Sequence, residues 1–209
     1  MLDKLLHWDT ALFNLINHHR CDFADWVMAL FSYSLFIDVI VVLITFFIIW
    51  QKKFKYWYIY VLLIAVAILL ADRISVICFK DVIQRLRPSH ALVDSVTLKL
   101  QHWQLIDWYK GGKYGFVSSH AANIFAVISF AFLVLRKQTK YFKIFIVLAL
   151  LWALLTCYSR VYCGFHYPLD VICGSLVGIF VGLFVFYIYR LLITKLKLEL
   201  TKQMNNNNE

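Results

Sequence analysis

A histidine and an aspartate in the C-terminal third of the chain have a spacing that could prepare an imidazole for catalysis. His166 and Asp170 flank Pro168, and proline is favoured in the first turn of a helix. We therefore expect both side chains on one face of a helix. There the carboxylate would accept one imidazole N–H and leave the other ring nitrogen free as a nucleophile or base. A capped helix start explains the same spacing equally well.

Three cations in the connections between apolar runs could bind an anion. Lys80 and Arg87 are seven residues apart, which is two helical turns, so both can point at one place before Pro88 stops the helix. Arg160 carries a planar guanidinium that suits a phosphate or carboxylate. Snorkelling at a membrane edge also explains cations at helix ends.

A third group of chemically useful residues, Val117-Ser118-Ser119-His120, runs directly into an apolar stretch. A serine in this position is an N-cap signal, and helix N-termini also bind phosphate through their free N–H groups. His120, in the first turn, could donate a proton to a leaving oxygen. The three groups together predict a phosphate site with two histidines in different roles. No cluster of carboxylates is present to hold Mg²⁺, so we expect no metal and no other cofactor.

The composition places these residues in a membrane protein. Of the 209 residues, 62% are hydrophobic, and the mean hydropathy is +0.72, well above a soluble domain. With only seven glycines and two prolines, the apolar runs indicate helices rather than a barrel. The formal charge of +9 comes from short clusters between apolar runs, which is typical of membrane topology. We therefore expect no nucleic-acid partner.

The hydropathy pattern predicts an all-α, polytopic membrane bundle of five to six transmembrane helices. Five runs approach the ~20 residues that cross a bilayer: 35–50, 58–79, 120–135, 141–158 and 168–193. Charges interrupt residues 1–34 too often for a comfortable span, so we expect an interfacial helix over 2–20 and a short segment over 23–31. A sixth span from this region is left open. Residues 194–209 form a polar cytoplasmic tail, and 201–209 are expected to be disordered.

Cation clusters orient the bundle. Residues 52–55, 136–143 and 190–197 alternate along the chain so that they share one side, which the positive-inside rule makes cytoplasmic. The connections 80–119 and 159–167 then share the opposite side. These two connections are dense in polar and catalytic residue types.

Taken in order, the motifs resemble the three signature motifs of the type 2 phosphatidic acid phosphatase family. They are Lys80-x6-Arg87-Pro88, Val117-Ser118-Ser119-His120 and Ser159-Arg160-x5-His166-x3-Asp170. The likeness covers residues 70–185. The second motif departs from the family's usual Pro-Ser-Gly-His, because Val117 and Ser119 replace the proline and the glycine. If that glycine needs a positive φ, Ser119 would be strained.

This resemblance implies a six-helix membrane phosphatase that needs no metal and faces the periplasm, the exterior or a lumen. We expect the phosphatase domain over 35–193, and a sixth helix would have to come from residues 1–34. By position, His166 would form a phosphohistidine and Asp170 would orient it. His120 would protonate the leaving group and then activate water. The phosphoryl oxygens would be held by Lys80, Arg87, Ser118, Ser119 and Arg160.

The expected partners are a phosphorylated lipid substrate and the lipids of the inner membrane. The preferred substrates are undecaprenyl diphosphate, phosphatidylglycerol phosphate and phosphatidic acid. The alternatives are a lipid A phosphatase, a phosphoryl transferase on the same scaffold, and a non-enzymatic anion-binding membrane protein. The aromatic connection 89–116 is expected to shape the choice of headgroup, and the sequence predicts no oligomeric state.

Overall fold

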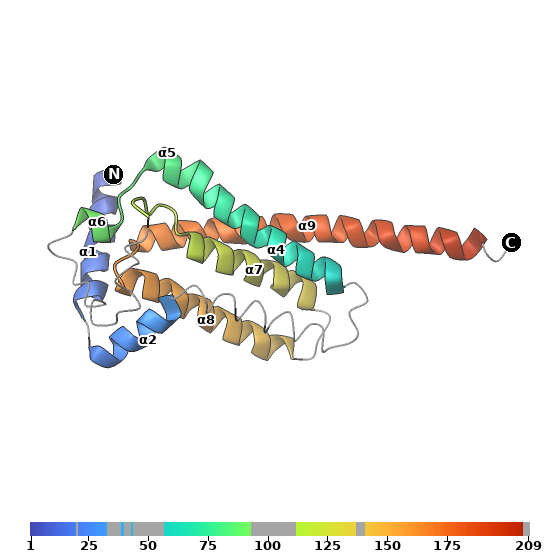
Figure 1. Cartoon of the computed structure of the whole chain (residues 1–209), viewed down its shortest axis with the longest axis horizontal. Coiled ribbons are helices and arrows are strands. Elements are labelled where there is room, and N and C mark those ends of the chain that lie inside the picture. The colour runs from blue at the N-terminus through green and yellow to red at the C-terminus, as the bar shows by residue number, and fades with distance from the viewer. Residues whose placement is uncertain are drawn as a thin grey trace.

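The computed structural model describes residues 1–19, 21–32, 39, 43, 57–92, 112–136 and 141–206. This part of the chain is almost wholly helical (Figure 1), which confirms the predicted all-α class. The elements are α1 (Leu2–His18), α2 (Asp22–Ser32), α4 (Trp57–Arg73), the π-helix η1 (Ile74–Lys80), α5 (Asp81–Ile83), α6 (Pro88–Ala91), α7 (Ser119–Leu135), α8 (Phe142–Tyr162) and α9 (Pro168–Asn206).

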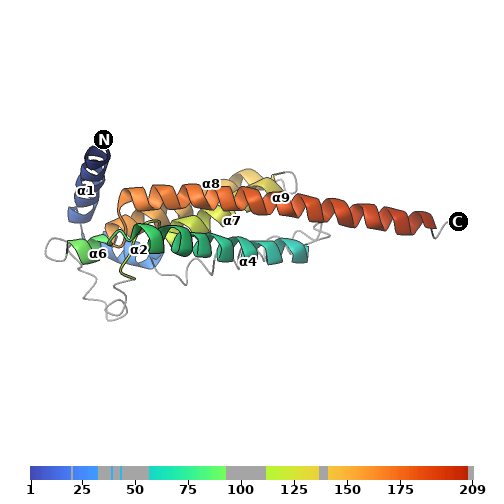
Figure 2. The same ribbon diagram turned by 90° about the horizontal axis from the view of Figure 1, so that it is seen from above.

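Three helices of the described chain are long and apolar enough to cross a membrane: Trp57–Ile83, Phe142–Tyr162 and Pro168–Thr201. Helix α7 is apolar but shorter, at 17 residues. The predicted span 35–50 lies outside the described residues apart from positions 39 and 43. Helices α4, α7, α8 and α9 run alongside one another, and α1 lies across one end of this bundle (Figures 1 and 2).

Helices α7 and α9 approach each other closely because α9 presents glycines to α7. A Cβ at Gly174 would lie 2.5 Å from the carbonyl oxygen of Ser118, and one at Gly178 would overlap the carbonyl oxygen of Ala122. Small residues let two membrane helices bring their backbones together. This contact sets the position of the first turn of α7 against the first turn of α9, where site residues lie.

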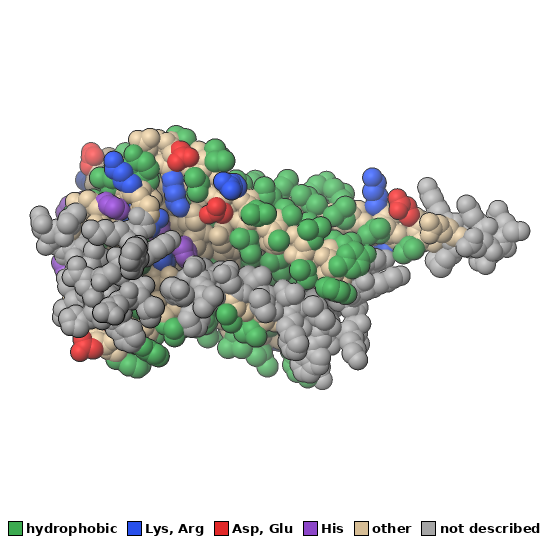
Figure 3. Space-filling view, in the orientation of Figure 1, with side chains coloured by type: hydrophobic (Ala, Val, Ile, Leu, Met, Phe, Trp, Pro, Cys, Tyr) green, Lys and Arg blue, Asp and Glu red, His purple; other side chains and the backbone are tan. Residues whose placement is uncertain are grey.

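Away from that end, the interior is apolar. Tyr60 of α4 stacks on Phe130 of α7 with ring centroids 5.1 Å apart, and Val181 and Val185 of α9 are buried in the same cluster. On the face seen in Figure 3, hydrophobic side chains cover the middle of the bundle, whereas histidine and many charged side chains lie toward the end that carries α1 and α5, and a few charged side chains lie on the projecting end of α9. This distribution is what a lipid-facing surface requires.

The C-terminal segment corrects one prediction. Helix α9 continues through residues 201–206, so these residues are not disordered as the sequence suggested. The stretch after Ile193 is rich in leucine and lysine, which are good helix formers. Lys195 and Glu199 are also spaced four residues apart, which supports a helix. Figure 1 shows α9 projecting beyond the rest of the bundle.

Candidate active site

The third motif lies in a tight turn between α8 and α9. The sequence pattern predicts that Arg160 lies in the connection after the helix. Arg160 instead belongs to the last turn of α8, because that helix extends to Tyr162. Gly164 then adopts φ 76°, a left-handed conformation that glycine allows. The chain folds back so that the N–H of His166 donates to the carbonyl of Arg160 at 3.1 Å. The turn therefore brings the imidazole of His166 within electrostatic range of the Arg160 guanidinium.

His166 and Asp170 meet by a different route from the one predicted. Helix α9 begins at Pro168, so His166 lies before the helix and the two side chains do not share a helix face. Their side chains still approach, with Nδ1 3.5 Å from Oδ2, and both are buried. Oδ2 of Asp170 also accepts the N–H of Tyr167 at 3.0 Å, as in a capping box. The catalytic and capping interpretations of this spacing therefore describe the same carboxylate.

The first motif also differs from prediction. The helix that carries Lys80 ends at Ile83, and Gln84 takes a left-handed conformation with φ 51°. Lys80 and Arg87 are therefore not two turns apart on one helix, and that expectation is wrong. No glycine or proline marks this break in the sequence.

An extended segment after Gln84 delivers Arg87 to the site. The N–H of Gly115 donates to the carbonyl of Arg85 at 2.8 Å, and the N–H of Arg87 donates to Lys113 at 3.2 Å. Nε of Arg87 then donates to the carbonyl of Tyr114 at 3.1 Å. This pairing with the segment before α7 holds the first and second motifs together.

The second motif opens α7. Ser118 is the N-cap residue with φ −72°, and Ser119 is the first helical residue. Gln84 is the non-glycine position with positive φ in the described chain, so the strain expected at Ser119 is absent. The hydroxyl of Ser118 is buried and has no hydrogen-bond partner among the described residues. Nζ of Lys80 donates to Oγ of Ser119 at 2.7 Å.

The three motifs converge on the two imidazoles. His120 lies within electrostatic range of His166, Arg160, Arg87 and Lys80. Burial lowers the pKa of His166 well below 6.5, and the charges of Arg87, Arg160 and Lys80 lower it further. A hydrogen bond to the backbone of Gly115 acts in the opposite direction. His166 is therefore neutral at neutral pH, which is the form that can attack phosphorus.

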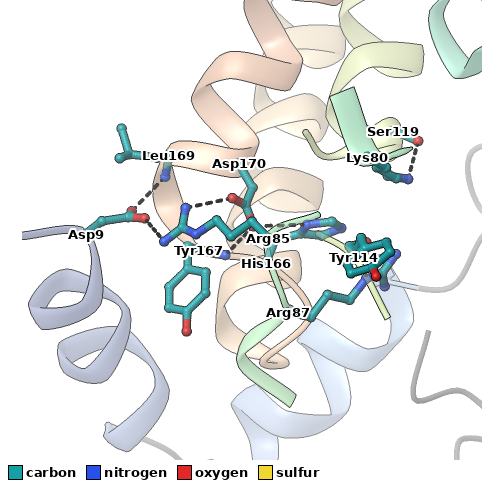
Figure 4. A network of polar contacts seen from close by, with 10 residues as sticks. All are labelled: Asp9, Lys80, Arg85, Arg87, Tyr114, Ser119, His166, Tyr167, Leu169 and Asp170. Atoms are coloured by element: carbon teal, nitrogen blue, oxygen red, sulfur yellow. Dashed lines mark hydrogen bonds and ion pairs between the residues drawn. The ribbon is translucent and has the colours of Figure 1, made fainter. Parts of the chain in front are cut away.

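Two further residues, which the sequence analysis missed, complete the network. Arg85 donates to Oδ1 of Asp170 at 2.9 Å and to Oδ2 of Asp9 at 2.6 Å, so that it bridges the two carboxylates (Figure 4). Asp9 is buried on the same face of α1 as Phe13 and Asn17. The spacing of four residues between Asp9, Phe13 and Asn17 could have indicated this in the sequence, because residues four apart lie on one face of a helix.

Arg160 has neighbours that the sequence did not indicate. Its Nη1 donates to the carbonyl and the hydroxyl of Ser32, at 3.0 Å and 2.7 Å. Its guanidinium lies over the ring of Phe165, 4.4 Å from the centroid. These contacts orient the cation and tie the end of α2 to the site.

Cations, a free hydroxyl, helix N–H groups and two imidazoles thus meet at one end of a membrane-spanning helical bundle. This is the chemistry of a protein that binds a phosphoryl group and can transfer it. The PAP2 superfamily model matches residues 56–193, so the chain belongs to the PAP2 superfamily. It is an integral membrane phosphatase, a hydrolase of phosphomonoester groups.

Two curated relatives share most of the chain. A lipid A 4'-phosphatase of Bacteroides thetaiotaomicron is 30% identical over 200 residues, 94% of this chain and 84% of the relative. A lipid A 4'-phosphatase of Porphyromonas gingivalis is 29% identical over 194 residues, 90% of this chain and 75% of the relative.

Two solved structures share the fold. A PAP2-type phosphatidylglycerolphosphate phosphatase from Bacillus subtilis superposes with a TM-score of 0.68 at 21% identity, covering 90% of this chain and 87% of the other. LpxE from Aquifex aeolicus gives a TM-score of 0.59 at 24% identity, covering 84% and 93%.

Proposed function

We propose that this protein removes a phosphate from a lipid headgroup through a phosphohistidine at His166, and that a lipid A phosphomonoester is its first candidate substrate. The convergence of the three motifs around a buried, neutral imidazole carries this proposal. A non-enzymatic anion site would need the cations alone. It would not need a histidine whose Nδ1 faces a buried carboxylate 3.5 Å away.

In the first step, the ring nitrogen of His166 that does not face Asp170 attacks phosphorus. The bond between phosphorus and the lipid oxygen breaks, and His120 gives that oxygen a proton. The cations neutralise the charge that spreads over the phosphoryl oxygens. The hydroxyl of Ser118, which is buried without a partner among the described residues, supplies a further donor.

In the second step, His120 takes a proton from water, and the water oxygen attacks phosphorus. The bond from phosphorus to His166 breaks, inorganic phosphate leaves, and both histidines return to their starting states. The carboxylate of Asp170 accepts the ring Nδ1–H of His166 in both steps and stabilises the ring when it is positively charged. The cations and hydroxyls do the work that Mg²⁺ does elsewhere, so no step requires a metal.

The curated relatives favour the substrate that the sequence alone left as an alternative. Both are lipid A 4'-phosphatases, and each is matched over most of its length. We therefore place lipid A phosphomonoesters ahead of undecaprenyl diphosphate, phosphatidylglycerol phosphate and phosphatidic acid. The aromatic connection proposed to select the headgroup falls mainly on residues 93–111, outside the described residues.

We also propose that the site faces the periplasm across the inner membrane. Arg136 follows the end of α7, and Lys143 lies in the first turn of α8. Both helices reach the site by their other ends, so these two cations lie on the side away from it. The positive-inside rule makes that side cytoplasmic.

A phosphate-release panel tests the proposal. The purified protein in detergent is given the four lipid classes with EDTA present, and the largest kcat/KM is expected for lipid A phosphomonoester. Quenching in alkaline detergent during turnover should trap labelled phosphate on the protein, because the bond between phosphorus and a histidine nitrogen survives alkali and breaks in acid. The absence of release from every lipid would overturn the function. Release that depends on an added alcohol acceptor would identify a phosphoryl transferase instead.

A further inference from the structure

We propose that Asp9 is a positioning residue: through Arg85 it holds the carboxylate of Asp170 against the imidazole of His166. This inference rests on the proposed function, since the reaction it supports is attack by His166. Asp9 is separated from Arg85 by 76 positions and lies outside the family match at residues 56–193.

The contacts form a continuous line from α1 to the catalytic ring (Figure 4). Asp9 binds one arm of the Arg85 guanidinium at 2.6 Å, and Asp170 binds the other at 2.9 Å. The second oxygen of Asp170 lies 3.5 Å from Nδ1 of His166. A guanidinium clamped at both arms cannot rotate, so the carboxylate that it holds has one orientation.

Asp9 also acts on α9 directly. Its Oδ1 accepts the N–H of Leu169 at 2.8 Å. Leu169 is the second residue of α9, and the first N–H groups of a helix have no partner within the helix. The carboxylate therefore caps the helix whose third residue is Asp170, and it complements the positive end of that helix.

The burial of this network distinguishes it from an ordinary surface ion pair. The side chains of Asp9 and Asp170 are 1% and 0% exposed, and that of Arg85 is 18% exposed. The Arg85 guanidinium also lies over the ring of Tyr167, 4.0 Å from its centroid. Burial raises the pKa of Asp9, while the hydrogen bonds from Leu169 and Arg85 lower it.

Helix α1 is anchored around Asp9 by apolar and polar contacts. Phe13 packs edge-on against Tyr167 at 5.3 Å, and Nδ2 of Asn17 donates to the carbonyl of Tyr162 at 2.9 Å. The opposite face of α1 exposes Trp8 and Leu12, as an interfacial helix requires. The N-terminal helix thus joins the lipid interface to the carboxylate that orients the nucleophile.

The test compares Asp9→Asn, Arg85→Gln and the double variant with Asp3→Asn, which removes an exposed charge from the same helix. Each of the first two should lower kcat roughly 10- to 100-fold, the cost of losing a partner that orients a catalytic side chain. KM should change little, because neither residue contacts the phosphate. The double variant should be no worse than the worse single variant. Asp3→Asn should behave as wild type.

A second measurement separates positioning from mere support of the fold. Protein labelled with ¹⁵N at histidine is titrated by NMR in detergent, with His166 assigned through its loss in His166→Ala. Charged or titratable groups surround this ring on every packed element: Lys80, Arg85, Arg87, His120, Arg160 and Asp170. Asp9→Asn removes an anion, so it should lower the pH at which His166 is half protonated. Arg85→Gln removes a cation, so it should raise that pH.

Arg85→Lys adds a test of geometry alone. Lysine keeps the charge but lacks the planar fork that spans two carboxylates, so kcat should fall while the midpoint of His166 stays near the wild-type value. If Asp9→Asn retains wild-type kcat, the proposal is wrong. It is also wrong if Asp9→Asn moves the midpoint up toward 6.5, since that would mean only that α1 excludes water.

The titration needs no substrate, so it separates the two proposals. A wild-type protein that releases phosphate from no lipid refutes the proposed function. Titration midpoints of His166 that shift in opposite directions in Asp9→Asn and Arg85→Gln would still support an electrostatic link from Asp9 through Arg85 and Asp170 to His166. Midpoints that shift in the same direction in both variants would refute this link, whatever the activity of the protein.

Discussion

The two halves of the α7–α9 pair are held together in different ways. Near the site, the N–H of Ser118 donates to the carbonyl of Asp170 at 2.9 Å, and the neighbouring side chains are polar and buried. Farther along, Gly178 and Gly182 of α9 meet the backbone of α7 at Ala122 and Ala126. The polar half holds groups that can react, and the apolar half fixes the distance between the helices that carry them.

This division explains how a site rich in buried charge persists at the end of a membrane bundle. Packing of small residues in a lipid environment comes from close backbone contact, so it does not depend on the protonation of any group. The polar half then needs only to orient its side chains. The two halves should therefore respond differently to substitution, and the following predictions test that difference.

The largest effect is expected from His166→Ala, which removes the proposed nucleophile. Turnover should fall by about 10⁴-fold or more, as when a nucleophile is lost from other enzymes. The apolar half is untouched, so the thermal unfolding midpoint in detergent should stay close to that of the wild type. A variant that retains most of its rate would show that another group attacks phosphorus.

Gly178→Leu changes the apolar half of the α7–α9 pair and substitutes none of the site residues. A leucine here meets the backbone of Ala122, and overpacking costs about 1–3 kcal/mol. Separation of the two helices should lower both the unfolding midpoint and kcat. Phe180→Leu is the matched control, because Phe180 is exposed on the same helix. An effect on activity without any loss of stability would contradict the structural role of this contact.

The sequence predicted which motifs meet at one end of the bundle better than it predicted the path of the backbone between them. Helical periods and apolar runs located the helices near the site, because local pattern and burial agree there. The break at Gln84 escaped prediction, because it depends on pairing with Gly115, which is distant in the chain. Asp9 escaped for the same reason, since its partners Arg85 and Leu169 become neighbours only in the folded protein.

A pH profile should report on the polar half alone. Burial and nearby cations lower the pKa of His166 well below 6.5, so the acid limb of kcat/KM should have its midpoint below 6.5. With His120 acting as an acid, the full profile should be bell-shaped. A single-limbed profile, or an acid limb above 6.5, would contradict the assigned roles.

The same pKa has a consequence for stability. The unfolded chain takes up a proton on this histidine near pH 6.5, whereas the folded protein resists protonation until a lower pH. Folding stability from this group should therefore be present above pH 6.5 and lost as the pH falls through the folded value. His166→Ala should flatten this part of a plot of unfolding midpoint against pH.

The smallest effect is expected from Ser119→Gly, which restores the glycine that is usual in the family motif. Ser119 accepts a hydrogen bond from Lys80 at 2.7 Å, so the change frees the cation to turn toward the substrate while it removes one hydroxyl. The bond that is lost has a charged donor, but the released Lys80 can donate to the phosphoryl oxygens instead, so the net loss should be about 1 kcal/mol and kcat/KM should fall about fivefold at most. Ser118→Ala should cost more, because that hydroxyl is buried and already lacks a partner among the described residues. If the two variants lose activity equally, both hydroxyls bind the phosphoryl group. Ser119 would then contact the substrate directly, and its role would not be to position Lys80.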